Sequence, residues 1–380
     1  MTNLTSREAN SVYLERLIFM TLLLVASAYL QGGRVILIAV LSVLLCMIVD
    51  AICCFLRKIQ YNIKDMAVPF WGIGMAAMMS SATSIPAVIL GSVICIAVGK
   101  HMFGASDNIV FSPPAIAAAF MMICYPADML YFTKFGEKYP ISGEWTGTFA
   151  RSADYSLKMG NPPTGSIFDI LLGRVPAAIA TGYILIIAIC CVCLVIRRSN
   201  SLGAILSCFA VVGIMAFFFP RTDSVSKAMS IFYELTSGYV FFGTVFLAAE
   251  PYRMPQRPMG RVLYGAVLGY ITMMFRFYGQ TEGSFLFALL ITTALTNSFD
   301  RVIDNLIYWK KTYLNSFEKN KNRVQRGEIK ITDTQEIEIP EKYKYNTPPI
   351  DGKIKKRHKQ KNADKEEQEK NEPKQNNDKS

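Results

Sequence analysis

Long uncharged apolar runs alternate with short polar segments over most of this 380-residue chain. Several runs reach the roughly 20 residues that an α-helix needs to cross a lipid bilayer, whereas others are shorter or interrupted by proline. The pattern predicts an all-α polytopic membrane protein, with about ten transmembrane helices in a membrane domain of residues 1–309. The runs are centred on Leu23, Leu44, Met75, Val93, Ala118, Ile187, Val212, Val240, Val267 and Leu290.

One polar break interrupts this pattern between two apolar runs. It comprises residues 99–104, with the sequence Gly-Lys-His-Met-Phe-Gly, and continues through Asn108 to Pro113 and Pro114. Backbone at membrane depth cannot leave its amides unpaired, so an irregular segment is tolerated there only against protein, ligand or water. The break therefore predicts a place where the membrane domain is built around something other than lipid. An ordinary connecting loop is the alternative interpretation.

The basic residues of the short loops indicate an orientation, because Lys and Arg accumulate on the cytoplasmic side of membrane proteins. If the predicted spans alternate in direction, one side carries most of the basic residues and both termini are cytoplasmic. That side has Arg7, Arg16, Arg57, Lys58, Lys64, Lys100, Arg197, Arg198, Arg253, Arg257 and Arg261, and the opposite side has Arg34, Arg221, Lys227 and Arg276.

Two long polar segments complete the predicted organisation. Residues 128–174 form the only long loop on the predicted external side, and a loop of that length is usually functional. From residue 310 onward the chain is polar and charged, with a basic cluster at residues 353–359. That composition cannot bury an apolar core, so residues 310–380 are predicted to be a charged, mostly disordered cytoplasmic tail.

The overall composition narrows the class of protein and its partners. The chain is 52% hydrophobic, which is too apolar for an ordinary soluble protein. Its formal net charge of +11 fits the predicted cytoplasmic loops and attraction to anionic lipid headgroups. We therefore expect the lipid bilayer to be a partner and do not expect nucleic-acid binding.

All nine cysteines fall within or beside apolar runs, and the predicted external loop has none, which argues against a disulfide framework. Residues 190–193, with the sequence Cys-Cys-Val-Cys, suggest metal or iron–sulfur chemistry because thiolates bind such clusters. Adjacent helical residues point about 100° apart and cannot converge without partners from elsewhere. Small apolar packing residues are the favoured interpretation, and a cluster shared with another subunit is the alternative.

Ionisable residues inside the predicted spans are functional candidates, because burying a charge in a bilayer is costly. Glu234 lies inside the eighth span, Glu250 at its cytoplasmic end and Asp50 near the end of the second span. We expect an ion path to use these three carboxylates, although Asp50, Glu250 and Asp300 could also lie at the membrane interface. His101 occupies the polar break, where a lone histidine is more often a packing or hydrogen-bonding residue than a metal ligand.

Motifs for soluble-enzyme chemistry are missing from the sequence. There is no nucleotide-binding glycine-rich loop followed by a helix, no His/Cys zinc spacing and no Gly-x-Ser-x-Gly nucleophile elbow. The sequence therefore predicts no catalytic residue within this chain and no metal site.

Five segments, taken in chain order, resemble sequence blocks of one membrane-protein family. They are residues 100–104 with Asn108, Phe111, Pro113 and Phe120, then residues 171–175, 243–251, 258–265 and 282–288. They resemble the family motifs K-x-x-F-G-G-x-x-x-N-x-F-N-P, F-L-G-x-x, G-A-F-F-M-A-T-D-P, P-x-G-R-x-x-x-G and E-G-x-x-F-A. The family is RnfD/NqrB, the D subunit of Rnf-type ion-translocating oxidoreductases and the B subunit of Na⁺-translocating NADH:quinone reductases. The resemblance runs from about Thr5 to Asp304 and covers the membrane domain.

The resemblance implies an FMN esterified to a threonine of an external loop. An ungapped alignment of residues 146–160 with the family's D-G-x-S-G-A-T-P-L-x-x-L-K-x-G motif places Ser152 at the acceptor position. Gly147, Leu157, Lys158 and Gly160 match, whereas Thr146, Arg151 and Ala153 replace the family's Asp, small residue and Pro. Ser152 keeps the required hydroxyl, Arg151 could pair with the flavin phosphate, and Thr164 is a second candidate. Absence of covalent flavin is the alternative.

The resemblance also implies that the breaks on the cytoplasmic side serve a second, non-covalent flavin or an ion path. His101, Asn108 and Glu250 are the residues best placed for that role. For the flavin on the external loop, a covalent bond to the protein would prevent loss of the cofactor. Local contacts with the protein would tune the electronic properties of that flavin.

Three functions remain open at this point. The first is a membrane subunit of a multi-subunit Rnf/Nqr-like complex, which passes electrons via flavin, coupled to Na⁺ or H⁺ translocation, and is not active alone. Its implied partners are the other subunits and a flavin transferase, and its implied location is the bacterial cytoplasmic membrane. The second is a degenerate paralogue that acts as a scaffold without covalent flavin. The third is a secondary transporter that uses Glu234 and the broken helices.

Overall fold

The computed structural model describes residues 6–102, 110–141, 147–222, 224–250, 253–279 and 282–325. Asn108 and residues 326–380 thus lie outside the described residues. The chain divides into two compact units, Met1–Trp309 and Lys310–Ser380.

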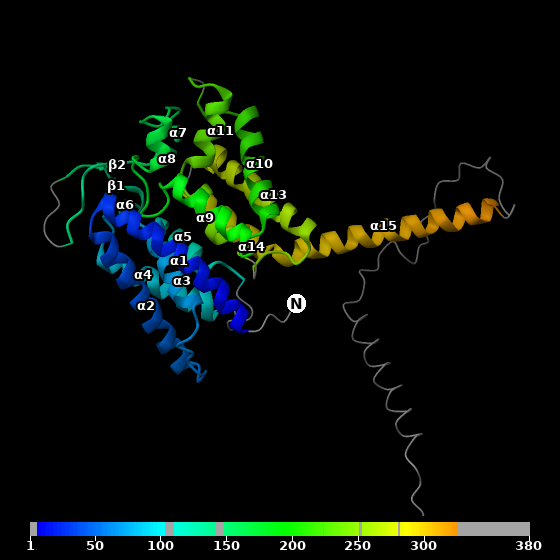
Figure 1. The fold of residues 1–380 in the computed structure, drawn as a ribbon, viewed down its shortest axis with the longest axis horizontal. Helices are drawn as coiled ribbons and strands as arrows, with labels where there is room; N and C mark the ends of the chain where they lie inside the picture. Colours follow the sequence, from blue (N-terminus) through cyan, green and yellow to red (C-terminus); the bar gives the residue numbers. More distant parts are fainter. Residues whose placement is uncertain are drawn as a thin grey trace, which may run out of the picture. The chain divides into compact units, whose positions relative to one another are not determined.

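The first half of the helical unit begins with two long apolar helices. Helix α3 packs against both α1 and α2 (Figure 1). Helix α5 packs against the π-helix η1. The elements are α1 (Ser6–Gln31), α2 (Arg34–Leu56), α3 (Ala67–Met78), α4 (Ile85–Val93), the π-helix η1 (Ile94–Met102) and α5 (Pro113–Cys124). Proline at the start of α4 and α5 suits a first helical turn, where its missing N–H needs no partner.

The predicted external loop has secondary structure of its own. It contains α6 (Pro126–Leu130), β1 (Phe132–Thr133), β2 (Phe149–Ala150), α7 (Ala153–Lys158) and α8 (Ile167–Leu172). The two strands are antiparallel, with Phe132 opposite Ala150. Ser166 and Asp169 form a reciprocal capping box at the start of α8, and Gly173 ends it with a left-handed φ of 77°.

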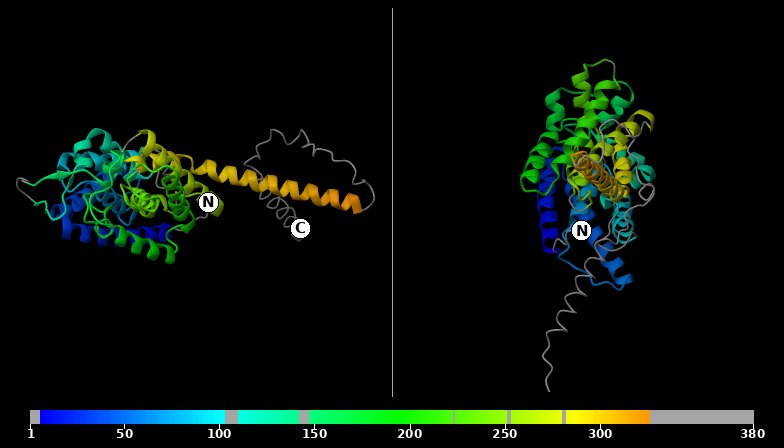
Figure 2. Two further views of the ribbon diagram at one scale, coloured as in Figure 1. Left: turned by 90° about the horizontal axis from the view of Figure 1, so that it is seen from above. Right: turned by 90° about the vertical axis from the view of Figure 1, so that its right-hand side faces the viewer.

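The second half contains two π-helical turns, η2 and η3, and each follows an α-helix without a break. Its elements are α9 (Ile184–Ile196), α10 (Leu202–Phe218), α11 (Lys227–Thr236), α12 (Val240–Gly243), η2 (Thr244–Ala248), α13 (Pro258–Met274), η3 (Phe275–Gly279), α14 (Ser284–Ala294) and α15 (Thr296–Gln325). Helix α10 packs along α13, α1 contacts α9, and α5 contacts α14. The helices of the two halves, blue to cyan and green to yellow, lie side by side in every view (Figures 1 and 2).

Burial follows the pattern expected of a membrane-embedded bundle. On α2, Ile36, Val40, Leu44, Ile48 and Ile52 recur every four residues and each is more than half exposed in the isolated chain. The opposite face of the same helix is buried against α3 and α4, and it carries the few polar positions of that helix. An exposed stripe that is entirely apolar, with the polar side chains of Ser42 and Asp50 on the buried face, is the reverse of a soluble protein and suits contact with lipid.

The structure confirms an all-α polytopic architecture, whereas the number of spans is not confirmed. Three described helices are long and apolar enough to cross a membrane, Asn10–Gln31, Arg34–Leu56 and Ile85–Met102. Two bent pairs, Lys227–Thr236 with Val240–Ala248 and Ser284–Ala294 with Thr296–Leu314, would raise that number to 5. Four of the other predicted spans correspond to shorter apolar helices, Ala67–Met78, Pro113–Cys124, Ile184–Ile196 and Leu202–Phe218, so ten spans stays a prediction.

Helix α15 continues beyond Trp309 as far as Gln325. The composition of residues 310–380 predicts disorder, but Lys, Glu, Leu and Gln in the first part of that segment are good helix formers. Residues 310–325 are therefore helical.

Candidate functional site

The predicted flavin acceptor Ser152 lies immediately before α7, where its side chain has two partners. Its Oγ accepts a hydrogen bond from the Tyr155 backbone N–H at 3.2 Å and caps the helix. The same hydroxyl donates to Oε2 of Glu282 at 3.2 Å. Arg151 donates from Nη1 to the other oxygen of Glu282 at 3.0 Å. One carboxylate thus holds both the candidate acceptor and the neighbouring arginine.

The rings of Tyr131 and Tyr155 flank the Arg151 guanidinium, 4.3 and 4.7 Å from their centroids. Ser152 and Glu282 line a hollow with an empty volume of about 520 Å³, part of which is open to solvent. Burial raises the pKa of the Glu282 carboxyl, and the nearby Arg151 opposes that rise. Glu282 is therefore positioned to accept the Ser152 hydroxyl proton, and Arg151 is positioned to pair with an anionic group.

The second candidate, Thr164, lies apart from this arrangement. It is exposed on the connection between α7 and α8, and it is not among the residues that line the hollow. Ser152 is consequently the candidate that has both a proton acceptor and a wall of surrounding protein.

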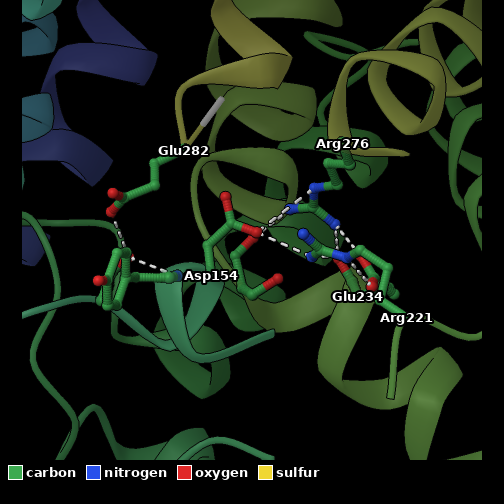
Figure 3. Close-up of polar contacts among 8 residues, drawn as sticks. Asp154, Arg221, Glu234, Arg276 and Glu282 are labelled. Carbon is green, nitrogen blue, oxygen red and sulfur yellow. Dashed lines mark hydrogen bonds and ion pairs between the residues drawn. The ribbon is translucent and has the colours of Figure 1, made fainter. Parts of the chain in front are cut away.

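A buried network of two arginines and two carboxylates includes Asp154, two residues after Ser152 (Figure 3). Asp154 belongs to α7 and is 2% exposed, and its Oδ1 accepts a hydrogen bond from Arg221 Nη2 at 2.8 Å. Arg276 in η3 donates from Nη1 to Oε2 of Glu234 at 2.6 Å and to the Glu234 backbone carbonyl at 2.7 Å. Arg221 also binds Glu234 through Nε and Nη2. We refer to these four residues as the arginine–carboxylate network.

The arginine–carboxylate network sets the electrostatic environment of Glu234. Burial alone would lower the pKa of Arg221, but Asp154 and Glu234 raise it above its ordinary range. Two arginines therefore balance the two carboxylates at a point where one unpaired charge would be costly. Glu234 lies in α11, before the 60° bend between α11 and α12, and both arginines bind its side chain. No contact among the described residues tests the predicted role of Glu234 in an ion path.

Glu250 lies just after η2 and is completely buried. Its Oε2 forms an ion pair with Arg253 Nη1 at 2.9 Å. Beyond that ion pair, neither Nη atom of Arg253 has a hydrogen-bond acceptor among the described residues. The Arg253 guanidinium lies 5.5 Å from the centroid of Trp71, whose indole N–H also has no acceptor there.

Arg16 on α1 reaches the same end of the molecule and is completely buried. It donates to three backbone carbonyl oxygens, those of Ser199, Phe246 and Ala249, each at 2.9 Å. It also donates to the side chain of Asn200. One guanidinium therefore joins the first helix to the end of α9 and to the π turn of η2.

Asp50 and His101, from α2 and η1, meet at a third polar cluster. Asp50 Oδ1 lies 2.8 Å from His101 Nε2 and 2.9 Å from Lys100 Nζ. Lys100 also contacts Oδ2 of Asp65 at 3.1 Å, and its ammonium lies 6.0 Å from the Trp71 ring. The structure thus brings Asp50 and His101 together, whereas Ser152 and Arg151 belong to a separate group of contacts.

Several functional candidates are missed when the sequence is read alone. Glu282 stands in a segment with family resemblance, and that resemblance is the only signal for it. The sequence gives no such signal for Asp154, Arg221 or Arg276, because a charged residue beside a predicted loop usually faces solvent. Lys100 is predicted only as a loop cation, yet it is 5% exposed.

Apolar helices that contain π turns, buried ion pairs and lipid-suited outer faces define a polytopic α-helical membrane protein. The chain belongs to the NQR2, RnfD, RnfE family, whose family model matches residues 4–308. This match confirms the family expected from the five sequence segments.

Named relatives come from both branches of the family. The B subunit of the Na⁺-translocating NADH-quinone reductase of Chromohalobacter salexigens is 26% identical over 223 residues, which cover 57% of this chain and 52% of the relative. The D subunit of the ion-translocating oxidoreductase complex of Halorhodospira halophila is 24% identical over 248 residues, 58% of this chain and 68% of the relative. The corresponding protein of Shewanella piezotolerans is 21% identical over 315 residues, with 73% and 87% covered. The chain spans about half the length of the NADH-quinone reductase subunits it matches.

Proposed function

We propose that this chain is a membrane subunit of a multi-subunit Rnf/Nqr-like electron-transport complex. In that complex it passes electrons via flavin, coupled to Na⁺ or H⁺ translocation, and it is not active alone. The observation that carries the proposal is the family match over residues 4–308, since relatives from both branches are named as subunits of such complexes. Other subunits would supply the NADH site and the iron–sulfur centres.

The proposed cofactor is FMN attached covalently to Ser152. The donor set around Ser152 suits a phosphoester, because Glu282 can take the hydroxyl proton and Arg151 offers a guanidinium to phosphate oxygens. A bound FMN would supply one- and two-electron transfer. The residues of this chain would hold its phosphate, and the arginine–carboxylate network would hold α7 in place through Asp154.

A second, non-covalent flavin and the ion path are proposed for the opposite end of the helices. Glu250, with the Arg253 and Trp71 donors beside it, has the strongest geometric support for either role. Asp50, Glu234 and His101 are already held by basic or acidic neighbours, and Asn108 lies outside the described residues.

We further propose the bacterial cytoplasmic membrane as the location, with both termini cytoplasmic and residues 128–174 external. Contacts between residues of the same predicted side support this topology. Arg16 binds the carbonyl oxygen of Ser199, and both residues belong to the predicted cytoplasmic side. Thr83 donates to the Asp128 carbonyl, and both belong to the predicted external side.

The experiment is coexpression with a flavin transferase, followed by ultraviolet fluorescence of the denatured protein and peptide mass spectrometry. The wild type should carry FMN on the peptide that contains Ser152, Ser152→Ala should lose it, and Ser152→Thr should keep it. Ser156→Ala, in the same helix, and Thr164→Ala are matched controls that should remain fluorescent. Fluorescence that survives Ser152→Ala and disappears in Thr164→Ala would transfer the site to Thr164.

A second candidate function is a scaffold without covalent flavin. The departure of Thr146, Arg151 and Ala153 from the family motif favours it, because the transferase would recognise those positions. A flavin-free wild type, expressed beside a family member that is labelled in the same cells, would support the scaffold and contradict covalent flavin.

A further inference from the structure

Three potential metal ligands from two elements converge at one end of α2. Asp50 and Cys54 are four residues apart on that helix and therefore share a face. Both are buried, at 2% and 6% exposure, opposite the lipid-suited stripe that contains Ile48 and Ile52. His101 approaches from the last turn of η1. A carboxylate oxygen, a thiol sulfur and an imidazole nitrogen all lie within 4.8 Å of one another.

We propose that Asp50, Cys54 and His101 bind a divalent transition-metal ion, and Zn²⁺ is the ion that their chemistry favours. A mixed set of sulfur, nitrogen and carboxylate oxygen is typical of Zn²⁺, whereas Ca²⁺ and Mg²⁺ prefer oxygen alone. The thiolate and the carboxylate would together balance the charge of the ion. Three protein ligands leave the fourth tetrahedral position to water.

The neighbouring cations can accommodate this ion. Lys100 lies 2.9 Å from Asp50 but also 3.1 Å from Oδ2 of Asp65, so it keeps a carboxylate partner when Asp50 turns to the metal. Arg57 donates to the His101 carbonyl at 2.9 Å and can retain that bond when Nε2 binds the metal and Nδ1 carries the proton. The Arg57 side chain is exposed and free to shift from Nδ1, which is 3.4 Å away.

The position of Cys54 separates a metal site from a simple ion-pair cluster. Lys100 and His101 already satisfy Asp50 electrostatically, and that arrangement needs no thiol. In a metal site the sulfur is a ligand, and the ion joins the end of α2 to the π turn of η1. This assignment goes beyond the proposed electron-transfer function, and it would give Asp50 and His101 a structural role in place of an ion path or flavin contact.

The test is metal analysis of the detergent-purified full chain without an affinity tag, after incubation with ZnCl₂ and removal of unbound ion. The wild type should retain one Zn²⁺ per chain, and Co²⁺ should give a thiolate-to-cobalt charge-transfer band. Cys54→Ser and His101→Gln should each lose the band and weaken Zn²⁺ binding by about tenfold or more. Cys53→Ser, which alters the adjacent thiol, is the matched control and should bind Zn²⁺ as the wild type does.

A second measurement on the wild type covers the case in which a variant does not fold. Zn²⁺ should slow alkylation of Cys54, quantified by peptide mass spectrometry, and should leave the rate at Cys53 unchanged. No retained Zn²⁺ in a monodisperse wild type, equal retention in Cys54→Ser, or equal alkylation of Cys54 with and without Zn²⁺ would each overturn the proposal.

Discussion

Asp154 Oδ1 lies 2.8 Å from Arg221 Nη2, which joins the short loop helix α7 to the segment between α10 and α11. Asp154 comes two residues after Ser152, so this contact also fixes the backbone that presents the candidate flavin acceptor. Arg276 of η3 lies 3.7 Å from the same oxygen atom. The predicted external loop is therefore anchored to helices of the second half by charge rather than by an apolar core alone.

The arginine–carboxylate network should be sensitive to the loss of one charge. Replacement of Arg276 by Met would leave buried Glu234 with Arg221 as its one basic partner among the described residues. Removal of one partner from a buried ion pair typically costs about 3–5 kcal/mol. We expect a clearly lower Tm for Arg276→Met in detergent.

The matched control is the double variant Glu234→Gln/Arg276→Met, which removes the opposed charges together. Its loss of Tm should be smaller than the sum of the two single losses, because the residues are in direct contact. Strictly additive losses would show that Glu234 and Arg276 are not energetically coupled.

Arg16 should not tolerate lysine. A single ammonium cannot reach the three carbonyl oxygens of Ser199, Phe246 and Ala249 that the guanidinium binds together. Each buried acceptor left unpaired costs about 1–3 kcal/mol, so Arg16→Lys should lower the Tm. The control is Arg197→Lys at the same end of the molecule, where the arginine is 60% exposed and pairs with Glu15. That variant should be close to wild type, and equal losses in both would refute the prediction.

Close packing of α10 on α13 should depend on Gly265. A Cβ at Gly265 would lie 2.2 Å from the Ala204 carbonyl oxygen, which is backbone and cannot swing aside. Gly265→Ala should therefore separate the helices and destabilise the protein by about 1–3 kcal/mol. In Gly213→Ala, on α10, the added Cβ would be 3.5 Å from Ile231, an ordinary contact. Thermal unfolding should show a loss for Gly265→Ala alone.

The predicted topology can be tested with one introduced cysteine at a time in a Cys124→Ser background, which removes the exposed natural thiol. Asn161 and Lys64 are both exposed and lie on opposite predicted sides. An impermeant thiol reagent applied to intact cells should label Asn161→Cys, and Lys64→Cys should be labelled only after permeabilisation. The reverse pattern would invert the orientation, and labelling of both in intact cells would contradict an odd number of spans between them.

The apolar pattern is sufficient to place the helices. The centre of every predicted span falls in a described helix, because runs of Leu, Ile, Val and Ala long enough to span lipid have few other solutions. The pattern cannot predict the π turns, since no residue type marks them. Nor can it predict the short helices and the two-stranded pairing inside residues 128–174, where local capping residues such as Ser166 decide the structure.

The candidate sites are only partly accessible from sequence for a different reason. Glu234 stands out as a costly buried charge, but its partner Arg276 is 42 residues away and falls in a predicted loop. Asp50 and Cys54 show a helical spacing, yet only the fold brings His101 to them. Periodicity describes one helix at a time, whereas convergence of side chains depends on how separate helices pack.

The hydrogen bonds of Arg16 limit how early α1 can reach its final packing during synthesis of the chain. Its acceptors are 183 to 233 residues further along the chain, so the ribosome must synthesise most of the membrane domain before they exist. Until then the Arg16 guanidinium lacks the carbonyl oxygens of Phe246 and Ala249 that bind it in the complete fold. Helix α1 is the first to enter the membrane, yet it is among the last to complete its contacts. A chain truncated before residue 246 would lack these contacts and would be recognised by chaperones and proteases.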